Sequence, residues 1–167
     1  MFMPIVTASL AAVLLGGWTF SEPDTRRQTP ANRIAGTWRV VEVTRDSAGT
    51  RRTAVYPGLY IFTQRHYSIT RIDSDKPRKD FPTNLRRTTE TYLDVWGPLN
   101  AHAGTYEIQG ERLRVVPQVA KNPSSMKAGS FITHTWRIAG DTLWLLAVAD
   151  QNGPITGGTQ VKLQRTE

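Results

Sequence analysis

The chain of 167 residues contains no cysteine. This absence excludes disulfide bonds, thiolate catalysis, lipid attachment to a cysteine and cysteine-based metal sites. The three histidines, His66, His102 and His134, have no second ligand at the spacing of a metal motif. No Gly-x-Ser-x-Gly motif is present, and the glycine-rich segment 153–158 contains no lysine, unlike a phosphate-binding loop. The sequence therefore indicates no catalytic residue, no metal and no cofactor.

The first 21 residues contain no charged side chain. Residues 4–20 are almost entirely apolar, a length typical of a secretory signal sequence and short for a membrane-spanning helix. Thr19 and Ser21 are small residues at the two positions that a signal peptidase reads, so we expect residues 1–21 to be a signal peptide cleaved after Ser21. A retained N-terminal anchor is the alternative, because no basic residue precedes the apolar segment. Either way, the sequence predicts a secreted or periplasmic protein.

Acidic side chains are outnumbered, with 14 Asp and Glu against 21 Lys and Arg, which gives a net charge of +7. This balance favours polyanionic partners such as nucleic acid or an anionic envelope surface. The basic residues form separate short clusters, and no aromatic residues are interleaved with them as a base-stacking surface requires. We expect no specific nucleic-acid binding and only weak association with an anionic envelope surface.

Residues 105–115 and 135–145 are two copies of one pattern, matched by identity or close similarity at most positions. Each copy has a strand-like segment, a turn of glycine followed by an acidic residue, and a returning strand-like segment. This is a strong short-range signal for a β-hairpin. The repeat predicts an antiparallel meander.

The rest of the chain adds short strands and one helix. Residues 22–33 are polar and contain two prolines, which indicates a linker before a domain of residues 34–167. Apolar positions follow a helical spacing in residues 84–96, and Gly97-Pro98 is a typical helix stop. We predict an all-β fold, an antiparallel up-and-down barrel of about eight strands with this one short helix. A β-sandwich is the second possibility. Besides the two hairpins, strands are predicted at residues 36–45, 53–55, 59–63, 66–73 and 159–165.

The turn at Gly140-Asp141 determines which side chains of its hairpin face inward, because side chains alternate between the faces of a strand. Pairing outward from this turn places His134 and Trp136 inside the barrel. The same pairing puts Arg137 opposite Trp144 on the outer face, which predicts a cation–π contact.

The other two hairpins give similar assignments. The turn at Gly110-Glu111 places Tyr106 inside and sets Glu107 opposite Arg114 outside, as a cross-strand pair and not a site. A turn at Gln64-Arg65 places further side chains on the inner face, namely Tyr60, Phe62, Tyr67, Ile69, Arg71 and Asp73.

The predicted lumen is apolar and aromatic with a few polar groups, which is typical of a small-molecule site. The same aromatic side chains equally suit a filled barrel interior. Arg71 requires a partner, either Asp73 or the carboxylate of a ligand. The candidate ligand-binding residues are Tyr60, Tyr67, Arg71, Tyr106, His134 and Trp136.

Four further segments stand in a characteristic order along the chain. They are Gly36-Thr37-Trp38, residues 103–108, Asn122-Pro123 and residues 136–143. Gly36-Thr37-Trp38 is similar to the lipocalin Gly-x-Trp signature, and the ordered series resembles the bacterial lipocalin-like domain family over residues 34–165. The resemblance implies a small barrel with one open end and an apolar ligand. It also implies that Trp38 closes the base and that Arg165, from the last strand, packs on it.

Three functions are compatible with these features. The leading hypothesis is a secreted or periplasmic protein that binds a small hydrophobic or amphiphilic molecule in the barrel lumen. The second is an enzyme of the isomerase or hydratase type, with Arg71 polarising an oxygen and His134 moving a proton. The third is an envelope-surface interaction module that uses the basic exterior. If Arg71 is paired with Asp73 and His134 with the backbone, the catalytic hypothesis fails.

Overall fold

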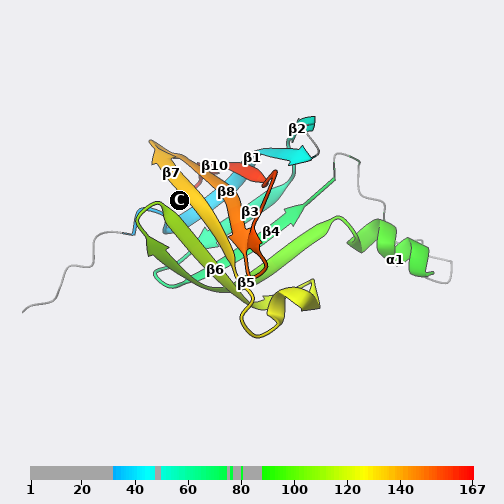
Figure 1. Ribbon diagram of the computed structural model, residues 1–167. Helices are drawn as coiled ribbons and strands as arrows, with labels where there is room; N and C mark the ends of the chain where they lie inside the picture. The colour runs from blue at the N-terminus through cyan, green and yellow to red at the C-terminus, as the bar shows by residue number, and fades with distance from the viewer. Residues whose placement is uncertain (1–31, 48–49, 75, 77–79, 81–87) are drawn as a thin grey trace, which may run out of the picture. The chain divides into compact units, whose positions relative to one another are not determined.

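The computed structural model describes residues 32–167, except 48–49, 75, 77–79 and 81–87. The segment predicted to be a signal peptide or anchor lies outside the described residues, as does most of the predicted linker. Figure 1 shows a barrel of strands with one α-helix beside it. In chain order the elements are β1 (Gly36–Ser47), β2 (Thr50–Ala54), β3 (Gly58–Phe62), β4 (His66–Ile72), α1 (Thr89–Trp96), β5 (Leu99–Gln109), β6 (Arg112–Ala120), the 3-10 helix η1 (Pro123–Met126), β7 (Ile132–Ala139), β8 (Thr142–Asp150), β9 (Gly153–Pro154) and β10 (Gln160–Arg165).

The strands form one closed antiparallel sheet. The order is β10-β1-β3-β4-β5-β6-β7-β8, and β8 pairs back with β10, which closes a barrel of 8 strands. Strand β2 pairs with β1, and the short β9 pairs with β8, so both lie outside the ring. Closure removes the exposed edges that an open sheet would present. The predicted up-and-down, lipocalin-like barrel is confirmed.

The two repeated hairpins have the predicted register. Ile108 lies opposite Leu113 in the β5–β6 pair, and Ile138 lies opposite Leu143 in the β7–β8 pair. Both turns begin with a glycine in the left-handed region, with φ 58° at Gly110 and 54° at Gly140.

The predicted contact across the outer face of the second hairpin is also present. The guanidinium of Arg137 lies 3.5 Å from the ring centroid of Trp144. Glu107 is opposite Arg114 as predicted, and the Arg114 guanidinium lies 4.1 Å from the ring centroid of Phe131. None of these outer side chains faces the lumen.

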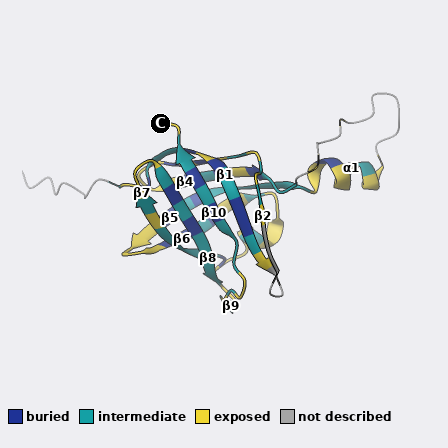
Figure 2. Ribbon diagram, turned by 90° about the horizontal axis from the view of Figure 1, so that it is seen from above, coloured by how far each residue is buried: buried dark blue, intermediate teal, exposed yellow. Residues whose placement is uncertain are grey.

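The core is the inside of the barrel. Buried and exposed side chains alternate along β3 and β4, as the pleat of a strand with one buried face requires. In Figure 2 the buried positions follow the strands of the ring. The side chains that are completely or almost completely buried are Ile34, Trp38, Val43, Leu113, Val115, Leu143, Leu145 and Leu163.

The boundaries of two predicted elements differ in the structure. Helix α1 begins at Thr89, where the Thr88 hydroxyl accepts a hydrogen bond from the Thr91 backbone at 3.2 Å, and it ends at Trp96 as predicted. Residues 84–87 of the predicted helix lie outside the described residues. Strand β5 begins at Leu99, well before the first copy of the repeat, because its first half pairs with β4. None of the helices in the described ranges is long and apolar enough to span a membrane.

Candidate functional site

One end of the barrel is closed by Trp38 and Arg165. The indole Nε1 of Trp38 donates to the Ile34 carbonyl at 2.8 Å, and the Arg165 guanidinium lies 4.0 Å from the Trp38 ring centroid. Arg165 also donates to the carbonyls of Ala35 and Arg33, both at 2.8 Å. The roles that the family resemblance implied for Trp38 and Arg165 are therefore present. We call this end the base.

Two of the six predicted site residues belong to the base side of the barrel. The hydroxyl of Tyr106 donates to the Thr63 carbonyl at 2.5 Å and accepts from the amide of Asn32. The indole Nε1 of Trp136 donates to the carbonyl of Gly110 at 3.1 Å, in the turn at the end of the first hairpin. The polar atoms of both side chains are thus bonded within the protein.

Arg71 and Tyr60 form a bonded polar group at the opposite, open end. Arg71 is buried and donates to both carboxylate oxygens of Asp73, at 3.1 Å for the Nη2–Oδ2 contact, and to the Tyr60 hydroxyl at 2.7 Å. Asp73 also contacts Arg45 at 3.0 Å and accepts from the Asn100 amide at 3.4 Å. The requirement of Arg71 for a partner is met by Asp73.

The charge state of this group follows from its contacts. Burial acts to raise the pKa of Asp73, but the hydrogen bonds and charge of Arg71, with the charge of Arg45, hold that pKa below its ordinary value. Asp73 is therefore ionised at neutral pH, and it binds two guanidinium groups.

Tyr67 is bonded to a histidine that the sequence analysis did not place. The Tyr67 hydroxyl lies 2.9 Å from Nδ1 of His102, and the two rings meet edge to face. Burial, and secondarily the charge of Arg71, lowers the pKa of His102 to about 4. His102 is therefore uncharged at neutral pH.

His134 lies on the inner face of β7, as predicted. The residue as a whole is half-buried, and its Nδ1 atom is buried and has no hydrogen-bond partner among the described residues. Burial lowers the pKa of His134 to about 4, and the charges of His102 and Arg71 act in the same direction, while a hydrogen bond with the backbone of Leu113 opposes them.

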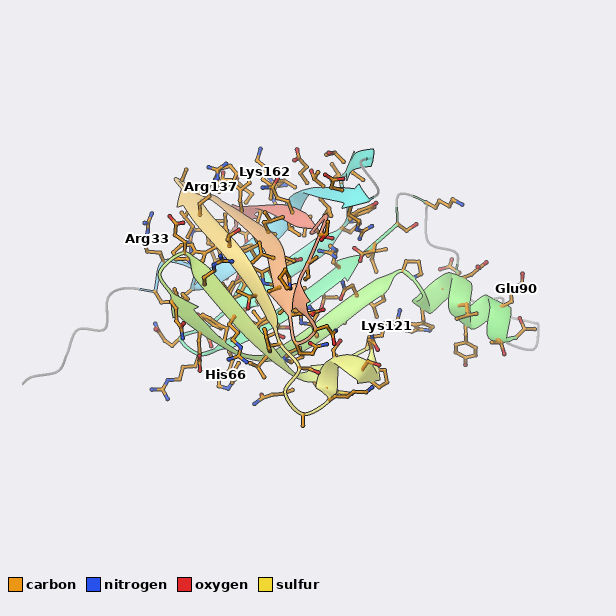
Figure 3. The ribbon with its side chains drawn as sticks, viewed as in Figure 1. Arg33, His66, Glu90, Lys121, Arg137 and Lys162 are labelled. Carbon is orange, nitrogen blue, oxygen red and sulfur yellow. The ribbon has the colours of Figure 1, made fainter. Side chains whose placement is uncertain are left out.

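A cavity of about 650 Å³ occupies the open end of the barrel. Both polar and apolar residues line it. Figure 3 shows Lys121 at this end and Arg33 at the other. We call this space the mouth cavity. It is lined by Asp73, Gly97, Pro98, Leu99, Asn100, Ala101, His102, Pro117, Ala120, Lys121, Asn122, Ser125 and Ile132.

One side of the mouth cavity is fastened to helix α1. The ammonium group of Lys121, which follows β6, donates to the carbonyl of Gly97 at 2.7 Å and to that of Trp96. A cation at these carbonyls is favourable, because the last carbonyls of a helix have no partner within the helix. Lys121 therefore holds the end of α1 against the rim of the cavity.

None of the six predicted ligand-binding residues lines the mouth cavity. Tyr60, Tyr67 and Arg71 lie behind its wall, where each bonds to a residue that does line it or to a direct neighbour of one. The sequence contained the signal for two lining residues, since alternation along β5 from the inward Tyr106 leads to His102 and Asn100. The residues after β6 gave no such signal, because their position depends on the chain path beyond the strand.

The arrangement suits binding better than bond chemistry. The pairing of Arg71 with Asp73 and Tyr60 removes the electrophile that the enzyme hypothesis required. Across the described ranges, no group of three His, Asp or Glu side chains is placed to hold a metal ion. The site is a cavity with apolar and polar walls, and the uncharged imidazole of His102 is part of its lining.

No protein-family model matches the sequence, and no curated protein matches it significantly. Among solved structures, the chain is similar to a lipocalin-like protein from Bacteroides uniformis, with 14% sequence identity and a TM-score of 0.44. The match covers 79% of this chain and 97% of the other.

Proposed function

We propose that this protein binds a small amphiphilic molecule in the mouth cavity. The observation that carries the proposal is the cavity itself, about 650 Å³ in volume, at the open end of a closed barrel. Its walls alternate apolar groups such as Pro117 and Ile132 with polar groups such as Asn100 and His102. Cavities of this size with a few convergent polar groups are typical of small-molecule sites.

Aromatic side chains that fill the barrel between the mouth cavity and the base limit the size of the ligand. Phe62, Tyr67 and Tyr106 pack against one another, and Phe62 meets Tyr106 edge to face at 5.4 Å between ring centroids. A long apolar chain has no path past these rings. A short amphiphile, with its apolar part against the cavity wall, therefore fits better than a long, wholly apolar one.

The proposed setting is outside the cytoplasm. It rests on the uncharged, apolar residues 1–21 and their small residues at the expected cleavage positions.

Two measurements test the binding function. Native mass spectrometry of protein purified from its own source identifies a bound molecule, and thermal unfolding with a panel of short-tailed amphiphiles measures stabilisation by the ligand. A ligand at about 100 times its Kd adds about 2.7 kcal/mol to the unfolding free energy. If no compound in a broad panel binds and none copurifies, the binding function is wrong.

A cavity-filling variant places the site. Ala120 lines the mouth cavity, so Ala120→Trp should abolish the ligand-induced stabilisation. Ala139→Trp is the matched control, because Ala139 is exposed at the far end of β7. Circular dichroism checks that both variants keep the β-sheet. Loss of binding in Ala120→Trp with retention in Ala139→Trp is the expected result.

A further inference from the structure

We infer that the ligand of the mouth cavity has an uncharged headgroup with several hydroxyl groups, such as a sugar, and that this headgroup lies in a second cavity beside it. The inference rests on the proposed binding function and specifies the polar part of the ligand. It follows from a gap between β6 and β7, from the cavity that adjoins this gap, and from the polar groups that line that cavity.

The sheet leaves a gap between β6 and β7 at the mouth end of the barrel. The two strands pair at four positions, the last of which joins Val115 to Ile132. Strand β7 begins at Ile132, whereas β6 continues through residues 116–120. These five residues lie beside β5 on one side and beside no strand of the described ranges on the other. Residues 121–131, which include η1, connect the two strands at this place (Figure 1).

A second cavity, of about 230 Å³, adjoins the mouth cavity at this gap. The two cavities share four lining residues, of which one is on β6, one is the first residue of β7 and two are on the connection between them. A ligand that passes between β6 and β7 therefore reaches both cavities. The second cavity is smaller than the roughly 300–1,000 Å³ of a site for a whole small molecule, so it suits one part of a ligand. The shared residues are Pro117, Asn122, Ser125 and Ile132, and the second cavity is also lined by Ser124, Ser130, Phe131, Asp150 and Gln151.

Three polar side chains of the second cavity are held in place by the backbone. Asn122 and Asp150 each accept a hydrogen bond from the backbone N–H two residues later, at 3.0 and 2.7 Å. Gln151 accepts from the N–H of Phe131 at 3.4 Å. Each of these side chains keeps a second polar atom that has no partner in the described part of the chain. Because the side chains are already oriented, a ligand that bonds to these atoms pays little for ordering them.

The remaining polar atoms include both donors and acceptors. The amide nitrogens of Asn122 and Gln151 donate, and the second carboxylate oxygen of Asp150 accepts. The hydroxyl groups of Ser124 and Ser125 do both. A ligand hydroxyl also donates and accepts, so a headgroup with several hydroxyls can bond to all of these groups.

The charges around the second cavity favour an uncharged headgroup. Among the described residues that line it, Asp150 alone is charged, so an anionic headgroup would meet a charge of its own sign. A cationic headgroup has no acceptor for the two amide donors. The cation of the mouth cavity, Lys121, already donates to two carbonyl groups at the end of α1.

Four probes with the same eight-carbon tail separate the headgroups. Octyl β-D-glucoside, octan-1-ol, octanoate and octylammonium are titrated into the intact protein at neutral pH, below the concentrations at which they form micelles, with affinity measured by calorimetry. We expect the glucoside to bind at least about tenfold more tightly than each of the others, because it alone forms several hydrogen bonds without bringing a charge into the cavity. Equal or tighter binding of another probe would overturn the headgroup assignment and leave the binding function intact. Failure of all four to bind, while another amphiphile does, would also overturn the assignment alone.

Backbone amide chemical shifts locate the headgroup. Octyl β-D-glucoside should shift the NMR signals of Ser124 and Gln151, in the second cavity, and of Ala101 and Ala120, in the mouth cavity. Octan-1-ol should shift only the signals of Ala101 and Ala120. If the glucoside also shifts only these two, the headgroup does not lie in the second cavity and the inference is wrong.

Two variants test the second cavity without altering the lining of the mouth cavity. Ser124→Leu and Gln151→Leu should each weaken octyl β-D-glucoside binding by about three- to tenfold, through the loss of one hydrogen bond between uncharged groups. Both should leave octan-1-ol binding unchanged, whereas damage to the fold would weaken both ligands. Asn152→Leu is the matched control, because Asn152 is exposed beside Gln151 and is not among the described residues that line either cavity. Unchanged glucoside affinity in both variants, or equal losses for the two ligands, would overturn the site.

Discussion

The base and the mouth of the barrel use the same strands in opposite ways. At the base, Trp38 is completely buried, and Arg165 covers it while its donors bond to backbone carbonyls. At the mouth, Asp73, Asn100 and His102 surround a cavity of about 650 Å³. The named polar atoms at the base are bonded within the protein, whereas the buried Nδ1 of His134, on β7, has no hydrogen-bond partner among the described residues.

This difference indicates that the two ends of the barrel have different roles. The base stabilises the fold through packing and bonded polar groups, whereas the mouth contributes less to stability because it contains a cavity. The four predictions below test this difference. Substitutions at the base should affect the unfolding free energy most, and perturbations of the mouth should have smaller or pH-dependent effects.

The largest effect is expected for Trp38→Ala. Removing the indole leaves a cavity under Arg165, and substitutions of this kind cost about 3–5 kcal/mol of unfolding free energy. Urea denaturation followed by circular dichroism measures the loss. Trp144→Ala is the control, since Trp144 packs on the outer face with Arg137 and should cost only about 1 kcal/mol. Equal losses in the two variants would show that the base is not the stabilising end.

Acidification should destabilise the protein through protonation of His102 and His134. The folded-state pKa of both His102 and His134 is about 4, below the ordinary value of 6.5, so the unfolded chain binds more protons between these values. The unfolding free energy should therefore fall as the pH drops from about 6.5 to 4, because both imidazoles become protonated more readily in the unfolded chain.

Urea denaturation at a series of pH values tests this window. Asp73 acts at lower pH, because its pKa is depressed and its contribution is lost only below its ordinary value of 3.8. His134→Leu should flatten the slope above pH 4, and His66→Gln should leave it unchanged. If the unfolding free energy still falls with pH in this range in a variant that lacks both His102 and His134, the prediction is wrong.

Asp73→Asn should cost about 2 kcal/mol, because it leaves the buried Arg71 without its carboxylate partner. The cost is smaller than for a fully buried pair, since Asp73 is partly exposed. The double variant Arg71→Met/Asp73→Asn should recover most of the loss, and thermal unfolding of the three variants measures the coupling. Additive losses would mean that the pair contributes nothing as a pair.

The smallest effect is expected for Lys121→Met, which removes two hydrogen bonds to the end of α1. Because Lys121 is exposed, the change should be about 0.5–1 kcal/mol and local. Hydrogen exchange should show faster exchange in α1 and unchanged exchange in β6. Faster exchange throughout the barrel would show that the fastening at the rim affects the whole fold.

The fold could be predicted closely because its rules are local. The glycine-acid turns determine hairpin register, and register determines which side chains face inward, so the pairs Trp136–Leu145 and Arg137–Trp144 follow from the sequence. The packing of Arg165 on Trp38 was predicted from the family resemblance alone, and the structure contains this contact.

The mouth cavity was less predictable, for physical reasons. Inward direction says nothing about depth, so Tyr106 and Trp136 were expected to contact a ligand although their polar atoms are bonded near the base. His102 lay within reach of the alternation rule along β5, had that strand been extended to Leu99. Lys121 and Ser125 line the cavity because of how the chain turns after β6, which depends on tertiary packing.

Strand β10 has a consequence for how the chain acquires its structure. It pairs with β1 and β8 at once, and Arg165 bonds to Ala35 across 130 positions of sequence. Contacts between residues so far apart in the sequence have a large entropic cost of loop closure, and they slow folding. During synthesis the earlier strands leave the ribosome with two open edges, which only β10 can join. The barrel should therefore close in a late step of folding, which deletion of β10 would prevent.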